Sequence, residues 1–369
     1  MAPAREGRRP SRAVRRRQLW ALLASGGVLA LLAGCGVGGN GDKTGVSLIL
    51  KTQTNPYFVS MKQAAKEAAK QSGTHLSVAT GQADGDTPSQ INAIYTAIAR
   101  GDKGILITSN GAAVNAALRQ AKDDGLFVIA LDTPLDPAKV ADVTYATNNF
   151  QAGKLIGQYA AAKLNGKKAV IAMLDLYDDQ VVSVDVDRDH GFLTGMGIDP
   201  GSKTLNAKEA RTGTYNGGKG GSYTIACHQA TQGAVDGGRT AMEQCLSRNP
   251  DINVVYTINE PAGEGAYAAL KADNHQDKAF IVSIDGSCQG MADVEKGLFA
   301  ADATQYPGKM AQLGVDAVAK IGAGQQAPSL PPGQDYLDTG TKLVTADPLP
   351  GLDSQTPAQG KKACWGTTG

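Results

Sequence analysis

Residues 252–270 read INVVYTINEPAGEGAYAAL, and this stretch contains a complete strand-to-helix unit. The apolar run that ends near Ile258 predicts a buried strand, and the alanine-rich run after Pro261 predicts a helix. Asn259 and Glu260 stand between them, at the end of the strand. Burying an unpaired amide or carboxylate costs about 2 kcal/mol or more, so the end of this strand must meet water, a partner group or a ligand.

The same unit of strand, polar turn and helix recurs along most of the chain. Residues 57–72 form an expected helix that ends at Gly73, and Thr87-Pro88 opens another helix with Thr87 as its N-cap. Continuous apolar strands that alternate with helices are typical of parallel sheets buried on both faces. The expected strands form two series, at residues 46–50, 76–79, 105–108, 127–131 and 143–146, and at residues 169–174, 253–258, 280–284 and 300–304.

The two series predict an α/β fold with two Rossmann-like lobes, each built on a parallel sheet. The chain has 369 residues, which is long enough for two such domains. Residues 199–233 interrupt the second series, and their richness in glycine, threonine, asparagine and lysine predicts an elaborated loop or hairpin. Charged residues make up 19% of the chain and the formal net charge is +1, which argues against a nucleic-acid partner or a charged membrane-binding surface.

The first 34 residues have the layout of an export signal. A head rich in arginine precedes an apolar stretch at residues 19–32, which is too short and wrongly flanked for a membrane-spanning helix. Leu32-Ala33-Gly34-Cys35 resembles the bacterial lipobox, which implies cleavage before Cys35 and a diacylglycerol thioether on its sulfur. The alternative is an ordinary signal peptide that contains a cysteine. Residues 35–44 then form a flexible tether, and both Sec and twin-arginine export stay open.

Four further cysteines, Cys227, Cys245, Cys288 and Cys364, suit disulfide bonds in an oxidising compartment. Four cysteines allow three pairings, and spacing cannot choose among them. We favour Cys227–Cys245 and Cys288–Cys364, of which the second would staple the C-terminal tail to the body. Metal binding is the competing interpretation, but the chain has no C-x-x-C motif and its four histidines are scattered, so no metal is expected.

The residues that close the strands are the candidate site, because ligands of open parallel sheets bind beyond the carboxyl ends of the strands. Six strands from the two series end in amides, carboxylates or hydroxyls, which would line a cleft between the two lobes. Each such residue also has a local interpretation, since Asp, Asn and Ser cap helices. The strand-end residues are Lys51 to Asn55, Thr108, Ser109 and Asn110, Asp132 and Thr133, Asn259 and Glu260, Asp285, and Gln305.

Several motifs, in order, give residues 46–345 a family resemblance. The stretches TNPYFVSMKQAAKEAA, VIALD, RDHGF, INVVYTINEP, SIDG and ATQYP resemble periplasmic sugar-binding proteins of the ribose-binding type, the substrate-capture components of ABC importers. RDHGFLTGMGID, DGGRTAMEQCLS, INVVYTINEPA and the terminal CWG are most similar to fructose-binding members. The resemblance implies a type I periplasmic binding protein whose lobes are joined by three crossings. Its N-terminal lobe would comprise residues 45–147 and 306–334, and its C-terminal lobe and tail residues 148–305 and 335–369.

The resemblance also implies roles for the strand-end residues. Carboxylates, amides and a guanidinium would hydrogen-bond the hydroxyls of a sugar, and two aromatic rings would cover its C–H faces. The expected ligand-binding residues are Asn55, Tyr57, Phe58, Ser109, Asp132, Arg188, Asn259, Asp285 and Gln305.

Some of these assignments have alternatives. Tyr57 and Phe58 could be ordinary core residues at a helix start, and Arg188 could form a salt bridge with a neighbouring aspartate. Thr133 stands where the family's ribose binders have arginine, and Ile284 where they have phenylalanine. The C-terminal lobe is therefore expected to stack less on its sugar and to hydrogen-bond more.

The function implied by the resemblance is capture of one monosaccharide by closure of the two lobes, for delivery to an ABC permease and its ATPase subunits. Fructose is favoured, and ribose or another pentose or hexose is the alternative. The protein would be a monomer, held at the outer face of the cell membrane by its lipid alone, with no cofactor and no nucleic-acid partner.

Other functions fit the sequence less well. A secreted enzyme of the glycosidase kind would use Asp132 and Asp285 as opposed carboxylates, but the amide-rich surroundings favour binding. A sugar-responsive repressor would need a helix-turn-helix headpiece where the export signal stands. Asp185-x-Asp187-x-Asp189 lacks the glycine and glutamate of a calcium loop, and GTYNGGKGG at residues 213–221 lacks the G-K-[ST] of a phosphate loop.

Overall fold

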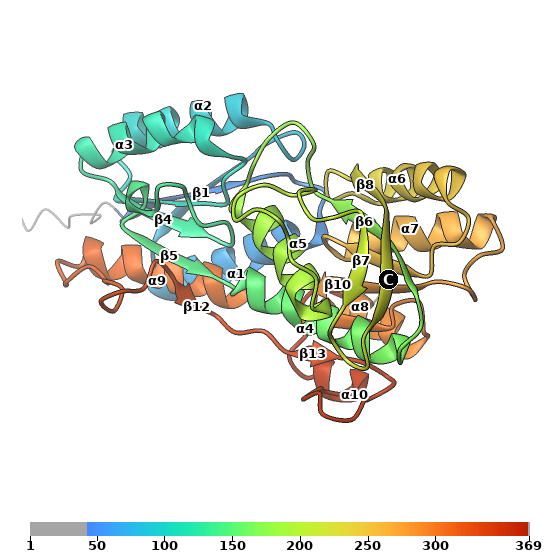
Figure 1. Ribbon diagram of the computed structural model, residues 1–369. Helices are drawn as coiled ribbons and strands as arrows, with labels where there is room; N and C mark the ends of the chain where they lie inside the picture. The colour runs from blue at the N-terminus through green and yellow to red at the C-terminus, as the bar shows by residue number, and fades with distance from the viewer. Residues whose placement is uncertain (1–42, 368–369) are drawn as a thin grey trace, which may run out of the picture. The chain divides into compact units, whose positions relative to one another are not determined.

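Two β-sheets form the framework of the computed structural model, which describes residues 43–367 (Figure 1). The first sheet has the strand order β12-β5-β4-β3-β1-β2, and the second has the order β13-β11-β10-β9-β6-β8-β7. Neighbouring strands run parallel except in the β7–β8 and β11–β13 pairs. The expected α/β fold with two mainly parallel sheets is therefore confirmed.

Helices cover both faces of the first sheet. Adjacent residues of β1 point to opposite faces, so Leu48 packs in a hydrophobic cluster with α1 and α9, and Ile49 packs in another with α2 and α3. The strands of this sheet are β1 Gly45–Leu50, β2 His75–Thr80, β3 Gly104–Ile107, β4 Phe127–Leu131, β5 Val143–Ala146 and β12 Leu337–Asp338. Its helices are α1 Pro56–Ser72, α2 Thr87–Arg100, α3 Asn115–Asp123 and α9 Pro307–Gly322, with short 3-10 turns at Ala112–Val114 and Ala138–Val140.

The second sheet is covered in the same way. Ile171 of β6 packs with α4 and α5, while its neighbour Ala172 packs with α6, α7 and α8. The strands are β6 Ala169–Asp175, β7 Thr212–Tyr215, β8 Gly221–Ala230, β9 Val254–Thr257, β10 Phe280–Asp285, β11 Ala301–Thr304 and β13 Leu343–Val344. The helices are α4 Asn149–Leu164, α5 Ser183–Met196, α6 Val235–Arg248, α7 Glu260–Ala272, α8 Cys288–Glu295 and α10 Pro357–Gly360.

The chain passes between the two sheets three times, after β5, after β11 and after β12. The third crossing lies later than expected. Leu337 of β12 pairs with Tyr145 of β5, so the first lobe keeps the chain at least to Asp338 and its expected end at residue 334 is wrong. A two-residue strand carries too little periodicity to be found from sequence.

Two local expectations need correction. Residues 212–230 do form a hairpin, but β8 is also an internal strand of the second sheet, where Ala169 pairs with Tyr223. The glycines and polar residues around β8 conceal this strand in the sequence. Thr87 is the first residue of α2 rather than its N-cap, because the side chain of Asp86 accepts the hydrogen bond from the Ser89 amide.

Glycines let α4 and α5 meet with direct contact between their backbones. A Cβ at Gly153 would collide with the backbone of Arg188, and one at Gly157 with the backbone of Phe192. The contact is reciprocal, since a Cβ at Gly191 would collide with the backbone of Phe150. Arg188 lies on α5, so this close contact determines where its side chain can reach.

Both favoured disulfides are present. Cys227–Cys245 joins β8 to α6, and Cys288–Cys364 joins the start of α8 to the C-terminal tail. No helix within residues 43–367 is both long and apolar enough to cross a membrane. Cys35 and the expected signal at residues 1–34 lie outside the described residues.

Candidate functional site

A small cavity of about 30 Å³ lies where the carboxyl ends of strands from both sheets meet. The first sheet contributes residues that follow β1 and β4, and the second contributes residues that follow or end β9, β10 and β11. Eight of the nine expected ligand-binding residues line this cavity, namely Asn55, Tyr57, Phe58, Asp132, Arg188, Asn259, Asp285 and Gln305.

Tyr57 and Asp132 form the polar wall of the first lobe. Asn55 is the N-cap of α1 and accepts a 2.9 Å hydrogen bond from the backbone amide of Tyr57, which places Tyr57 in the first turn of the helix. The Tyr57 hydroxyl then donates to Oδ1 of Asp132 over 2.9 Å, and the Thr133 hydroxyl donates to Oδ2 over the same distance. Burial and the charge of Asp132 raise the pKa of Tyr57 well above its usual value, so the phenol stays a proton donor.

Asp285, Gln305 and Arg188 form the opposite wall. Asp285 ends β10, and its Oδ1 accepts a 2.8 Å hydrogen bond from Nε2 of Gln305. Nη1 of Arg188 lies 4.0 Å from the same oxygen. Burial raises the pKa of Asp285 to about 7, although Arg188 and the Gln305 hydrogen bond both oppose this shift. The carboxyl of Asp285 is therefore poised to change charge near neutral pH.

Arg188 is held by two neutral acceptors rather than by a close ion pair. Its Nε donates to Oδ1 of Asn149 over 2.9 Å, and its Nη1 donates to the carbonyl of Ile258 over 2.8 Å. Asn149 begins α4 and Ile258 follows β9, so the guanidinium is fixed from two elements of its own lobe. The alternative of a salt bridge to an aspartate is present only in the long 4.0 Å contact with Asp285.

Asn259 and Glu260 close β9 in different ways. Asn259 lines the cavity, caps α7 by accepting from the Ala262 amide, and donates from Nδ2 to the Gly233 carbonyl. Glu260 turns away from this cavity, and its Oε1 accepts from the backbone amides of Gly286 and Ser287. The buried carboxylate of Glu260 is thus a structural support for the turn after β10.

The aromatic pair Tyr57 and Phe58 lies where both the cavity and the core can use it. Tyr57 and Phe58 line the cavity, and both also belong to the core cluster of the first lobe. Their rings stand edge to face with centroids 5.4 Å apart. The functional and the structural interpretations of these two rings are therefore compatible.

Ser109 does not line the cavity. It is buried, its hydroxyl donates to the Gly111 carbonyl over 3.0 Å, and the same oxygen accepts from the Gly111 amide. Its side chain shapes the loop after β3. This is the local structural role that a serine at the end of a strand can have without touching a ligand. Ser109 is therefore the one expected ligand-binding residue that lies outside the lining of the candidate cavity.

Five lining residues were not among the expected contacts. Lys51 and Asp84 add two charges, and Leu176, Val184 and Ile258 add apolar surface. Burial raises the pKa of Asp84 to about 6, against the opposing charge of Lys51. Lys51 follows β1 and stood among the strand-end residues, and Asp84 follows β2, whose end was not considered. Applying the strand-end rule to β2 as well would have pointed to the loop that contains Asp84.

The cavity as a whole offers hydrogen-bond groups of every kind and four apolar side chains, those of Phe58, Leu176, Val184 and Ile258. Carboxylates can accept from hydroxyls, amides can donate and accept, and the Lys51 and Arg188 cations can donate. This combination fits a small polyol, whose hydroxyls both donate and accept. A volume of about 30 Å³ holds about two water molecules, so a larger ligand requires the two lobes to separate.

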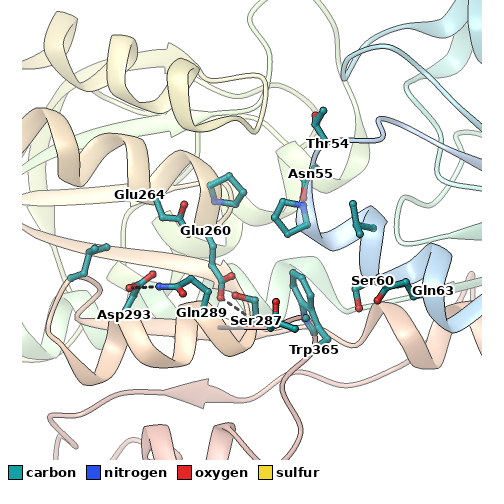
Figure 2. A pocket seen from close by; sticks show the side chains of 16 residues that line it. Thr54, Asn55, Ser60, Gln63, Glu260, Glu264, Ser287, Gln289, Asp293 and Trp365 are labelled. Carbon is teal, nitrogen blue, oxygen red and sulfur yellow. Dashed lines mark hydrogen bonds between the residues drawn. The ribbon is translucent and has the colours of Figure 1, made fainter. Parts of the chain in front are cut away.

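A larger cavity of about 770 Å³ lies beside the first, between α1 on one side and α7 and α8 on the other. Figure 2 shows Trp365 standing between Ser287 and Ser60, and the same indole packs edge-on against Tyr57. Asn55 lines both cavities. The larger one is lined mainly by helix residues, so the smaller one remains the candidate binding site.

Comparisons with known proteins agree with this architecture. A family model described as "Periplasmic binding protein domain" matches residues 46–326. The D-ribose/D-allose-binding protein of Pseudomonas aeruginosa is 23% identical over 313 residues, which cover 83% of this chain and 90% of that protein. The ribose import binding protein RbsB of Escherichia coli is 25% identical over 285 residues, covering 77% and 86%. A periplasmic solute binding protein of an ABC transporter from Actinobacillus succinogenes, solved with bound D-allose, superposes with a TM-score of 0.68 at 24% identity, covering 82% and 98%.

Proposed function

The chain belongs to the periplasmic binding protein family, and from this premise we propose that it captures a monosaccharide outside the cytoplasm for an ABC importer. The convergence of Asp132 from the first lobe with Arg188, Asp285 and Gln305 on one cavity carries the proposal. The relatives named above are binding proteins, so the chain is a receptor rather than an enzyme. Its partners are then a permease and the associated ATPase subunits.

Binding works by closure in this proposal. A sugar that hydrogen-bonds Asp132 in one lobe and Asp285 in the other makes both sets of contacts only when the lobes approach. The ligand therefore stabilises the closed arrangement by its differential affinity for it. The permease then distinguishes the loaded receptor by this arrangement.

Fructose is the sugar we favour, on the strength of the motifs around Arg188, Asn259 and the terminal Cys364-Trp365-Gly366. Ribose and allose, which the named relatives bind, are the principal competitors. Thr133 occupies the place of an arginine in ribose binders and donates to Asp132, which weighs against an identical ribose contact.

The anchoring of the protein is part of the same proposal. Cys35 would carry a lipid after cleavage of residues 1–34, and residues 35–44 would tether the two lobes to the outer face of the membrane. Mass spectrometry of the membrane-extracted protein tests this directly. A diacylglyceryl adduct on Cys35 is expected, and a soluble product cleaved elsewhere would contradict it.

Calorimetry with a panel of pentoses and hexoses tests the sugar assignment. Saturable binding of one sugar per chain is expected, with fructose among the tightest ligands. Failure of every sugar to bind would overturn the assignment. Incubation with oligosaccharides checks the glycosidase alternative, because turnover would show that Asp132 and Asp285 act in catalysis.

A further inference from the structure

A second group of titratable side chains lies in the C-terminal lobe, away from the sugar contacts. Asp175 ends β6, Asp189 lies on α5 one residue after Arg188, and His228 lies on β8. The three residues are far apart in sequence and are brought together by the pairing of β6 with β8 and the packing of α5. Spacing along the chain gives no sign of this cluster.

The ligand atoms of the cluster lie at distances that suit one metal ion. Nδ1 of His228 is 2.6 Å from Oδ2 of Asp175 and 4.0 Å from Oδ2 of Asp189. One nitrogen and one oxygen from each carboxylate all lie within 4.8 Å of one another. Metal–ligand bonds of about 2.0–2.2 Å span such separations after small side-chain adjustments.

A second observation concerns Asp189. Its side chain is 0% exposed, and neither of its oxygens has a hydrogen-bond partner among the described residues. Oδ1 of Asp175 is likewise buried without a partner there. Among the described residues, the basic side-chain nitrogens within 4.0 Å of its oxygens are Nδ1 of His228 at 4.0 Å and Nε2 of His190 at 3.9 Å. Buried carboxylates are normally paired, hydrogen-bonded or bound to metals, so these oxygens are available to bind a cation.

We propose that Asp175, Asp189 and His228 bind a first-row divalent cation, with Zn²⁺ as the favoured ion. An imidazole nitrogen with carboxylate oxygens suits Zn²⁺, whereas Ca²⁺ takes six to eight oxygen ligands. The cation replaces the proton on Nδ1 of His228, and that proton passes to solvent.

Glu209 acts as a positioning residue for this site. Its Oε1 lies 2.8 Å from Nε2 of His228, so it accepts the hydrogen bond of the nitrogen that does not face the cluster. A carboxylate in this place fixes the orientation and tautomer of a metal-binding histidine. The cluster is also accessible, because His228 lines two cavities of about 430 and 580 Å³ and its side chain is 18% exposed.

Calorimetry of the tag-free full chain with ZnCl₂ tests the proposal. One Zn²⁺ per chain and a rise in Tm that EDTA reverses are expected, with little or no response to CaCl₂. Asp189→Asn is close in size to the native residue and should weaken Zn²⁺ binding at least about tenfold, and Glu209→Gln about 10- to 100-fold. His75→Gln is the matched control, because His75 is exposed and outside the cluster.

Two results would overturn the proposal. One is no saturable Zn²⁺ binding by the native chain, which would leave His228 as an imidazolium in an ion-pair network only. The other is equal Zn²⁺ affinity in the native chain and in both folded variants. A cooperative thermal unfolding transition in the same samples separates a misfolded variant from a folded one that has lost its metal, so the outcome does not depend on sugar binding.

Discussion

The indole of Trp365 stands edge-on against the ring of Tyr57, with centroids 5.4 Å apart and planes at 87°. Tyr57 belongs to the first lobe, whereas Trp365 donates from Nε1 to the Asp285 carbonyl of the second lobe over 3.1 Å. The neighbouring Cys364 is bonded to Cys288 at the start of α8. The C-terminal tail therefore contacts both walls of the candidate site without lining its cavity.

Replacing Trp365 by alanine is expected to weaken sugar binding about tenfold. The substitution removes an aromatic contact worth about 0.5–1.5 kcal/mol and a hydrogen bond worth about 1 kcal/mol, and both support cavity residues. Calorimetry gives the affinity, and Tyr95→Ala is the control because Tyr95 is an exposed aromatic residue on α2. Native affinity in Trp365→Ala would show that the tail is only a structural staple.

Asp132→Asn should weaken sugar binding between tenfold and a hundredfold or more. Hydrogen bonds to a charged group contribute about 1.5–3 kcal/mol, and the amide keeps the size of the side chain while losing the charge. Ser109→Ala is the matched comparison, since Ser109 also follows a strand but bonds only Gly111. It should change the affinity less than about threefold. Equal losses in the two variants would contradict the site.

Sugar binding should weaken as the pH falls below 7. The pKa of Asp285 is about 7 in the folded chain against 3.8 for the free group. Between these two pKa values the carboxyl of Asp285 is protonated in the folded chain and ionised in the unfolded chain. Its contribution to the free energy of unfolding therefore falls as the pH rises through this range. Sugar binding has the opposite pH dependence, because the sugar hydroxyl donates its hydrogen bond to the ionised carboxylate. Affinity should therefore fall by up to about tenfold per pH unit below 7.

Calorimetry at pH 8, 7, 6 and 5.5 measures this dependence. Asp285→Asn should bind more weakly than the native chain at pH 8 and show a flatter profile, because its amide does not titrate. A native affinity that stays constant over the range would mean that the sugar does not select the ionised form of Asp285.

Removing Cys288–Cys364 should affect both stability and binding. The bond closes a separation of 76 residues, and chain entropy predicts a loss of about 4.5 kcal/mol in the free energy of unfolding for the double serine variant. Removing Cys227–Cys245, with a separation of 18 residues, should cost about 3 kcal/mol. Urea unfolding measures both. Only the variant without Cys288–Cys364 should also lose sugar affinity, because it frees Trp365. Equal sugar affinities in the two variants would argue against a role of Trp365 in binding.

Gly153→Ala should destabilise the protein and weaken sugar binding together. A Cβ there collides with the backbone of Arg188, and overpacking of this kind costs about 1–3 kcal/mol. Gly308→Ala is the control, since its Cβ would make only an ordinary contact with Ala64 on α1. The control should be neutral or slightly stabilising in thermal unfolding. Unchanged affinity in Gly153→Ala would mean that α5 can shift without moving the Arg188 side chain.

The order of strands and helices was largely predictable from the sequence. The apolar run at β4 matches the expected residues 127–131, because strands buried on both faces favour apolar side chains at every position. β5 also matches the expected residues 143–146, although it contains the buried Thr144. β8 was missed as a sheet strand, and β12 and β13 were missed altogether. In all three cases pairing with a neighbouring strand, rather than the local sequence pattern, determines the strand.

The residue types of the site were predictable for a related reason. Parallel strands place their carboxyl ends at one edge, so polar residues such as Asp132, Asp285 and Asn259 could be selected without knowing their contacts. Only the tertiary structure decided which of them share the cavity. It excluded Ser109, added Lys51 and Asp84, and set Trp365 against Tyr57. It alone assembled Asp175, Asp189 and His228, because contacts between distant segments depend on how whole elements pack, and no local pattern records that packing.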